Sequence, residues 1–177
     1  MLLACALLCI AQLSYAQIGT SLSFFSLEAE NSRGSQNLSN LGHFQVSYEV
    51  PVFDKIRITP SYSLYILGSD FSDLGYGLNV GVSYFPFSLN RSMIHRSKDL
   101  FIHSAEKIRP FVGLSFHQRQ YQSIQSTYAG LGIKFGADYQ WKPDTRVSFF
   151  IASLSLSGPL DSQVTEFQAG VGTSLDF

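Results

Sequence analysis

The stretch TYAGLGIKFGADYQW, residues 127–141, alternates between apolar and polar side chains along its whole length. Leu131 and Phe135 belong to the apolar set, whereas Lys134 and Asp138 belong to a second set that also contains three glycines. Alternation with a period of two is typical of a β-strand whose faces meet different surroundings. The apolar face points inward in a water-soluble protein and outward to lipid in a membrane barrel. The direction of this face therefore decides the fold.

The composition of the chain favours one β-rich domain whose surface is not entirely in water. Its 177 residues suffice for one domain. Charged residues make up 14% of the chain, against about 25% in an average soluble domain. Aromatic residues make up a further 14%. The formal net charge of -1 gives no indication of a nucleic-acid partner, which would favour a basic chain.

The first sixteen residues, 1–16, are apolar and end in the small-x-small pattern Ser14-Tyr15-Ala16. This pattern predicts a secretory signal peptide that is cleaved before Gln17, leaving residues 17–177 as the mature domain. No Lys or Arg precedes Arg33, and a translation start upstream of Met1 would explain the missing positive charge. Both cysteines lie in the predicted signal, so the mature chain forms no disulfide.

Seven further segments share the alternation, and together with the opening stretch they predict eight strands. They are long for a soluble domain, where about 5 to 6 residues is typical, and suit a tilted strand that spans a membrane. The first changes its parity near Phe24 and Phe25, which suggests a bulge. Eight long strands in one small domain imply a closed barrel, because closure removes exposed sheet edges. The eight segments cover residues 18–30, 41–50, 56–66, 75–85, 108–119, 127–141, 146–156 and 164–177.

The connections between these segments differ at the two ends of the predicted barrel. PVFDK and KPDT are short turns at one end, whereas longer polar loops join strands at the other. This asymmetry is the pattern of outer-membrane barrels. The exception is the long connection, residues 86–107, at the short-turn end. Part of it could form one amphipathic helix with Ser97 as its N-cap, or it could be a disordered insertion, and the sequence leaves both open.

The polar faces of the segments combine charges of both signs with many glycines. Glycine weakens a strand, so a solvent-facing surface has no need of it, whereas a narrow barrel interior needs small residues opposite long ones. Eight strands leave a lumen just wide enough for side chains to fill. We therefore predict an all-β, eight-stranded, antiparallel, up-and-down transmembrane barrel with a filled polar interior. The predicted interior network consists of Glu49, Arg57, His117, Arg119, Lys134, Asp138, Glu166 and Asp176.

The apolar faces carry aromatic residues at one level. Four alternate segments should run toward the short-turn end, and each finishes there on an aromatic side chain. An aromatic girdle at the membrane interface requires this placement, although aromatic residues also favour strands in general. The predicted interface residues are Tyr48, Tyr84, Tyr139, Trp141 and Phe177.

Three stretches carry a resemblance to a known family: QAGVGTSLDF at the C-terminus, KIRPFVGLSF and GADYQWKPDTRVSFF. They resemble the transmembrane barrels of the OmpA-like and OmpX-like outer-membrane proteins of Gram-negative bacteria. The resemblance implies a monomer in the bacterial outer membrane, in contact with lipid and lipopolysaccharide, with both termini in the periplasm. It also implies that the barrel-assembly machinery reads the C-terminal strand and its final Phe177. The chain departs from OmpA in having no C-terminal peptidoglycan-binding domain.

Function follows less directly than fold, because this scaffold carries many activities. We expect a structural or surface-interaction role, in envelope integrity or adhesion-type contacts through extracellular loops, with no open channel, no enzymatic activity and no cofactor. One alternative is a lipid A-modifying enzyme, for which His103-Ser104 is the one adjacent His-Ser pair. A second is a soluble lipocalin-like binding barrel with inward apolar faces. The four histidines, His43, His95, His103 and His117, lack the spacing of a metal site.

Overall fold

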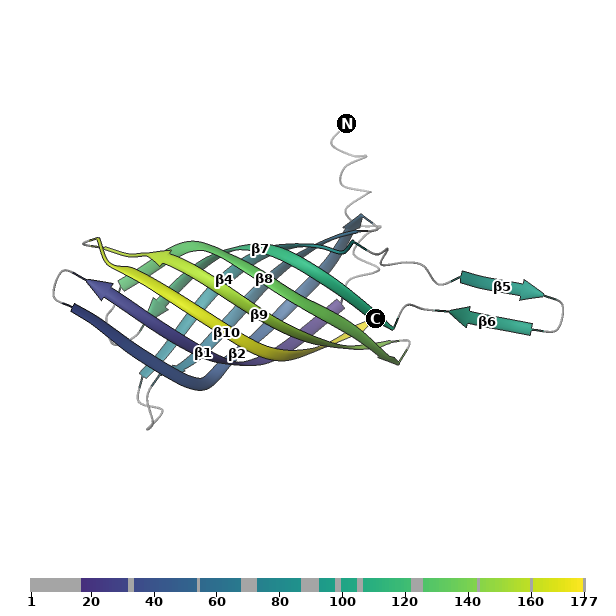
Figure 1. The fold of residues 1–177 in the computed structure, drawn as a ribbon, viewed down its shortest axis with the longest axis horizontal. Coiled ribbons are helices and arrows are strands. Elements are labelled where there is room, and N and C mark those ends of the chain that lie inside the picture. The colour runs from purple at the N-terminus through teal and green to yellow at the C-terminus, as the bar shows by residue number, and fades with distance from the viewer. Residues whose placement is uncertain are drawn as a thin grey trace, which may run out of the picture.

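The computed structural model is a closed barrel of eight strands with a separate two-stranded sheet (Figure 1). It describes residues 17–31, 34–53, 55–67, 73–86, 93–97, 100–104, 107–121, 126–142, 144–159 and 161–176. The strands are β1 (Gln17–Asn31), β2 (Gly34–Phe53), β3 (Ile56–Leu67), β4 (Asp73–Tyr84), β5 (Met93–Ser97), β6 (Leu100–Ser104), β7 (Ile108–Tyr121), β8 (Ser126–Lys142), β9 (Thr145–Ser157) and β10 (Gln163–Asp176).

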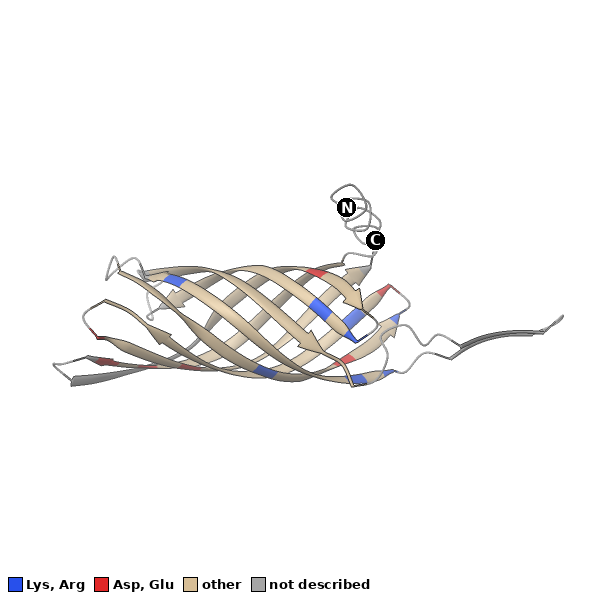
Figure 2. Ribbon diagram, turned by 90° about the horizontal axis from the view of Figure 1, so that it is seen from above, with Lys and Arg blue, Asp and Glu red and all other residues tan. Residues whose placement is uncertain are grey.

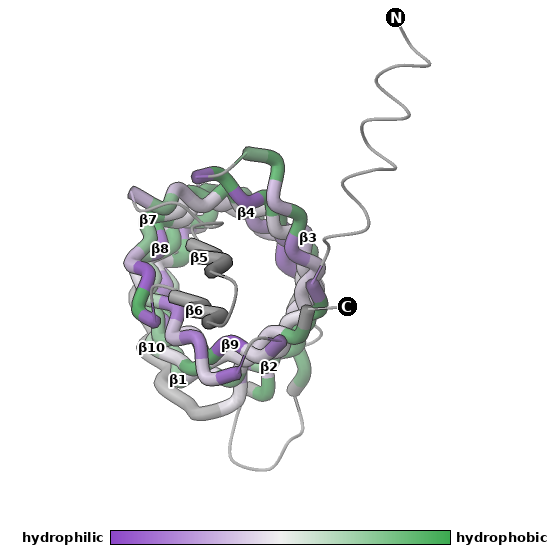
Figure 3. Tube along the Cα trace, turned by 90° about the vertical axis from the view of Figure 1, so that its right-hand side faces the viewer, coloured by the Kyte–Doolittle hydropathy of each residue, from purple (hydrophilic) through white to green (hydrophobic). Residues whose placement is uncertain are grey.

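The barrel has the predicted antiparallel, up-and-down order. Each barrel strand pairs with its neighbours in sequence, β4 pairs with β7, and β1 closes the ring by pairing with β10 from Gln17↔Asp176 to Glu30↔Gln163. The view along the barrel shows the closed ring of strands (Figure 3). Each of the eight predicted segments coincides with one barrel strand, so the predicted fold class is confirmed. We call the end with Gln17 and Asp176 the terminal end, and the opposite end the loop end.

None of the described residues lies in a helix that is long and apolar enough to cross a membrane.

The long connection contains a β-hairpin, so the amphipathic helix considered for it is wrong. β5 and β6 pair with each other from Met93↔Ser104 to Ser97↔Leu100 and form a sheet of their own. Ile94 and Ile102 are β-branched, and Phe101 is aromatic, so these five-residue runs favour extended backbone over helix. The candidate pair His103-Ser104 lies in β6.

The apolar faces point outward and the polar faces point inward. In β8, Leu131 is 68% exposed and Phe135 is 51% exposed, whereas Asp138 is 1% exposed. Every barrel strand contributes large apolar side chains to the outer surface. Charged residues are sparse along the strands (Figure 2). The orientation is the reverse of the lipocalin-like alternative, which is therefore contradicted.

The predicted bulge in the first strand is wrong, because β1 alternates without interruption. Ser23 and Phe25 are buried while Phe24 between them is exposed. The extra residue lies in the neighbouring strand β2: Ser23 pairs with His43 and Phe24 pairs with Leu41, which leaves Gly42 unmatched. The apolar residues of β1 thus shift from the outer face to the inner face, although the backbone of β1 contains no extra residue.

This change of parity reflects a change of surroundings along the barrel. Near the loop end the outer faces become polar, as exposed Glu28, Ser155 and Thr165 show. The inner faces become apolar at the same level. Where barrel strands pass from lipid into water, the polarity of both faces reverses, because apolar side chains are then sheltered from water inside the barrel. We call this inner cluster the apolar cap: it consists of Phe25, Leu27, Tyr65, Tyr128, Leu156 and Val164.

The connections at the loop end are shorter than predicted. β1 and β2 continue as paired strands to Asn31↔Gly34. Most of residues 31–40, which were predicted to form the first loop, are therefore strand. The remaining loop-end connections are residues 32–33, 68–72, 122–125 and 158–162. We call the ring of exposed large apolar side chains around the barrel, which includes Leu131, Phe135 and Val171, the apolar belt. The part of the barrel between this belt and the loop-end connections is built chiefly from strands.

Candidate functional site

The barrel interior contains a cluster of ion pairs centred on Arg57 of β3, which we call the Arg57 cluster. Arg57 Nη1 lies 2.8 Å from Glu49 Oε2 of β2, and Arg57 Nη2 lies 3.1 Å from Asp138 Oδ2 of β8. Arg146 Nη1 of β9 lies 3.5 Å from the same Asp138 oxygen, and the Ser148 hydroxyl donates to Asp138 Oδ1 over 2.7 Å. The cluster joins four strands across the lumen toward the terminal end.

Aromatic rings pack beside this cluster. Phe85, which follows β4, forms a buried group with Phe111 and Phe150. The Arg57 guanidinium lies 4.4 Å from the centre of the Phe85 ring. Lys134 Nζ lies 3.9 Å from the centre of the Phe150 ring and 5.9 Å from that of Phe111. These cation–π contacts place apolar surface against charged groups inside the barrel.

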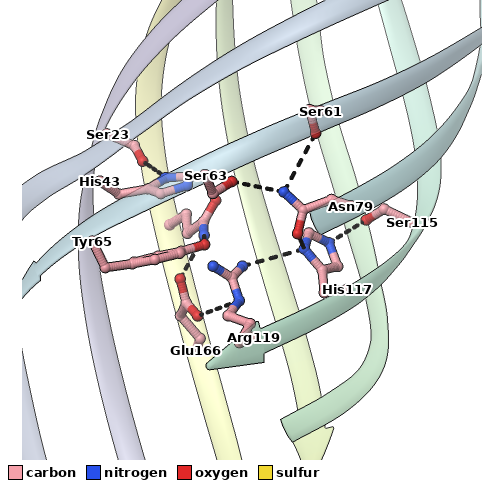
Figure 4. Close-up of polar contacts among 11 residues, drawn as sticks. Ser23, His43, Ser61, Ser63, Tyr65, Asn79, Ser115, His117, Arg119 and Glu166 are labelled. Carbon is pink, nitrogen blue, oxygen red and sulfur yellow. Dashed lines mark hydrogen bonds and ion pairs between the residues drawn. The ribbon is translucent and has the colours of Figure 1, made fainter. Parts of the chain in front are cut away.

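A second group, the Arg119 cluster, lies against the apolar cap (Figure 4). Arg119 Nε of β7 lies 3.5 Å from Glu166 Oε2 of β10, and both side chains are fully buried. The Arg119 guanidinium lies 4.1 Å from the centre of the Tyr65 ring. The Gln168 amide donates to Glu166 Oε1 and, over 3.5 Å, to the Tyr65 hydroxyl. The two buried charges thus form an ion pair, and the Glu166 carboxylate accepts a further hydrogen bond from Gln168.

Serine and histidine side chains extend the Arg119 cluster through further hydrogen bonds (Figure 4). Ser23 Oγ lies 2.6 Å from His43 Nδ1, and the His43 ring stacks on Tyr65 with centroids 4.4 Å apart. Ser115 Oγ lies 2.6 Å from His117 Nε2, while His117 Nδ1 lies 2.7 Å from Asn79 Oδ1.

The order Ser115, His117 and Asn79 matches the nucleophile, base and orienting group of a hydrolase triad. The surroundings of these three residues do not supply the other groups that a hydrolase site needs. All three residues lie in paired strands, whose backbone N–H groups are committed to the sheet and cannot stabilise an oxyanion. Arg119 Nη2 also lies 3.2 Å from His117 Nδ1, so a cation competes for the position of the orienting group. The arrangement serves hydrogen bonding better than acyl transfer.

A cavity of about 90 Å³ lies in the barrel interior. Its lining includes Lys134, Arg57, Asn79, His117 and small residues such as Gly113. Typical ligand sites measure about 300–1,000 Å³, so this cavity suits water-sized species rather than an organic substrate. Among the described residues, no group of three or more His, Cys, Asp or Glu side chains could hold a metal ion.

The structure brings seven of the eight predicted network residues into the lumen. Glu49, Arg57, Lys134 and Asp138 gather at or beside the Arg57 cluster. Arg119 and Glu166 form the second cluster, with His117 in contact with Arg119. Asp176 ends β10, and its side chain lies outside the described part of the chain.

Four of the five predicted interface aromatics lie on the outer surface near the terminal end. Tyr48, Tyr84 and Tyr139 are about half-exposed on β2, β4 and β8, and Trp141 is 69% exposed on β8. Phe177 lies outside the described residues.

Several interior residues were not among those predicted. Arg146 and Tyr65 occupy inward positions of their strands, and the same alternation could have identified them. Phe85 lies just past β4 and continues its inward parity, so the same alternation could have identified it as well. Its backbone N–H donates to Lys55 O over 2.8 Å.

Comparison with known proteins identifies the fold. No family model matches the chain, and no curated protein matches it in sequence. Among solved structures, Neisserial surface protein A is 16% identical with a TM-score of 0.61, covering 90% of this chain and 97% of that one. The outer membrane protease OmpT of Escherichia coli is 9% identical with a TM-score of 0.54, covering 92% and 97%. The N-terminal β-barrel domain of Pseudomonas aeruginosa OprF is 14% identical with a TM-score of 0.50, covering 90% and 97%. The chain thus has the fold of the small outer-membrane barrels.

Proposed function

We propose that the protein is an integral outer-membrane β-barrel of a Gram-negative bacterium, with a structural or surface-interaction role. One observation carries the proposal: large apolar side chains cover the outside of all eight barrel strands while charged and polar groups fill the inside. A soluble monomer rarely exposes more than a few hundred Å² of contiguous apolar surface. Lipid is the solvent that suits this surface.

Membrane fractionation followed by gel electrophoresis tests this location. We expect the protein in the detergent-extracted outer membrane, with an unheated band that runs faster than the boiled one. A closed sheet without edges explains why the barrel should survive detergent. Recovery in the soluble periplasm without a heat-induced shift would contradict the proposal.

The filled lumen supports a role other than conduction. The Arg57 cluster, the Arg119 cluster and the apolar cap occupy successive levels of an eight-stranded barrel, whose interior is just wide enough for side chains to fill. Planar-bilayer recordings should therefore show no sustained large currents. Large currents that disappear in Lys134→Met would instead indicate a path along the interior charges.

The same interior supports a non-enzymatic role over lipid A modification. The Ser115, His117 and Asn79 group faces a cavity too small for a lipid chain, behind a complete barrel wall. Expression in a host followed by mass spectrometry of its lipid A tests this point. We expect an unchanged acyl pattern, and the loss of an acyl chain would favour the enzyme alternative.

The partners that this function requires are lipid, lipopolysaccharide and the barrel-assembly machinery, with the barrel itself a monomer. The short loop-end connections shift the expected surface contacts from loops to the strand ends that project beyond the apolar belt. Replacing Phe177 by Ala tests the assembly signal. We expect less folded, heat-shifting protein than with Phe177→Tyr, which keeps an aromatic terminus, and equal amounts would exclude this role for Phe177.

A further inference from the structure

The Lys134 ammonium lies inside the barrel without a carboxylate of its own. Among the described side chains, no Asp or Glu oxygen lies within 4.0 Å of Lys134 Nζ. The two acids of the neighbouring Arg57 cluster are already bound by guanidinium groups: Glu49 by Arg57, and Asp138 by Arg57 and Arg146. Among the described side chains, the cations of Arg57, Arg146 and Lys134 therefore lie beside the two carboxylates of Glu49 and Asp138 at this level of the lumen.

The residues around Lys134 leave space beside this charge. Gly113 is its direct partner across β7 and β8, and Ser83 is the partner of Gly113 across β4 and β7. These small side chains create the cavity of about 90 Å³, which Lys134 lines. The Phe150 ring lies against the ammonium at 3.9 Å, and the cavity adjoins the same side chain.

The cavity also offers groups that can donate hydrogen bonds. The Ser83 hydroxyl lines it together with Lys134 and the Arg57 guanidinium. A buried charge without a partner is costly, and a counter-ion with hydrogen-bond donors around it removes that cost. A volume of this size holds a few water-sized species.

We propose that the barrel interior binds one small monovalent inorganic anion, a halide such as chloride, beside the Lys134 ammonium. The anion balances the charge of Lys134, while the Ser83 hydroxyl donates a hydrogen bond to it. The site strengthens the closed interior, because a ligand that binds only the folded barrel stabilises it by mass action. This inference concerns the lumen and does not depend on the surface role proposed above.

The test is the reversible urea unfolding of the barrel in lipid vesicles at fixed pH and ionic strength. Chloride is exchanged for gluconate, an anion too large for the cavity. For the wild type we expect the unfolding equilibrium constant to fall about tenfold for each tenfold rise in chloride above its dissociation constant. Lys134→Met should fold, as its heat-shifted band will show, and should lose this dependence. Lys142→Met removes an exposed lysine from the same strand and should keep it.

A wild type that unfolds equally in chloride and gluconate would overturn the proposal, since water alone would then fill the cavity. Equal chloride dependence in Lys134→Met and the wild type would overturn it as well. Crystals grown in bromide supply a measurement that needs no variant. An anomalous peak beside Lys134 Nζ is expected, and a map without one there would contradict the site.

Discussion

At the scale of single residues, the inward glycines make room for the large side chains of the lumen. A Cβ added to Gly136 would lie 2.5 Å from Phe111 Cζ and would also meet the Phe149 carbonyl oxygen. The backbone oxygen cannot move aside without disturbing the sheet. We therefore expect Gly136→Ala to lower the free energy of unfolding by about 1–3 kcal/mol, the usual cost of overpacking. Urea unfolding in vesicles measures it.

Gly81 provides the matched control, since it also faces inward from a barrel strand. A Cβ at Gly81 meets nothing closer than 3.6 Å, an ordinary contact. Gly81→Ala should be neutral or raise the free energy of unfolding by about 0.5–1 kcal/mol, because alanine loses less backbone entropy. Equal losses at both positions would mean that the lumen does not need glycine for space.

Arg57 is the residue on which the charge balance of its cluster depends. Replacing it by Met leaves the buried carboxylates of Glu49 and Asp138 without their shared guanidinium. We expect the free energy of unfolding to fall by about 3–5 kcal/mol, as when one partner of a buried pair is removed. Adding Glu49→Gln to this variant removes the carboxylate that has lost its guanidinium and keeps the Arg146–Asp138 pair, so it should recover much of the loss. A double variant as unstable as Arg57→Met would show that the lost packing of Arg57, not the unpaired charge, sets the cost.

At the scale of the strand, β10 passes from lipid to water along its length. Val171 belongs to the apolar belt, whereas Thr165 lies on the same outer face where that face has become polar. Arginine at the middle of a bilayer costs about 2–4 kcal/mol, and near the interface about 0–1 kcal/mol. Val171→Arg should therefore destabilise the barrel in vesicles, and Thr165→Arg should change it little. Similar costs at both positions would place Thr165 within the hydrocarbon as well.

The β5–β6 hairpin is an element that the barrel does not need in order to close. It pairs with itself, and β4 pairs directly with β7 from Gly75↔Tyr121 to Tyr84↔Val112. Deleting residues 90–106 and joining the ends by a short turn should leave the heat-shifted band unchanged. Phe85→Ala, just before the connection, should lower the urea midpoint because it removes a buried ring. Loss of the heat shift after the deletion would give the hairpin a part in assembly.

The elements also show what the sequence could and could not predict. The period of two located all eight barrel strands, because lipid outside and polar groups inside impose it on each strand. The same signal wrongly predicted a bulge at Phe24 and Phe25, where the outer face of β1 changes from apolar to polar while its backbone stays regular. Inward parity identified the charged residues of the lumen but not their pairs. Arg57 and Asp138 lie 81 residues apart in sequence, and only the tilt and stagger of the closed barrel bring them together.

At the scale of the whole molecule, the barrel has two different ends. At the loop end, polar outer faces surround the apolar cap, so this part of the barrel is built like a small soluble domain. At the terminal end, outward aromatic residues such as Tyr84 and Trp141 mark the level of a membrane interface. We expect a barrel with this asymmetry to have one stable orientation, with the loop end in the outer water and the termini in the periplasm.

Labelling with an impermeant maleimide tests this orientation directly. Both cysteines of the chain lie within residues 1–16, so the mature barrel offers no competing thiol once the predicted signal is removed. Gln163→Cys places an exposed thiol at the loop end, and Asp144→Cys places one in the turn at the terminal end. On intact cells we expect labelling of Gln163→Cys alone, and after permeabilisation equal labelling of both. The reverse pattern on intact cells would put the termini outside. The apolar cap would then face the periplasm, and the projecting strand ends could not serve as a contact surface with other cells.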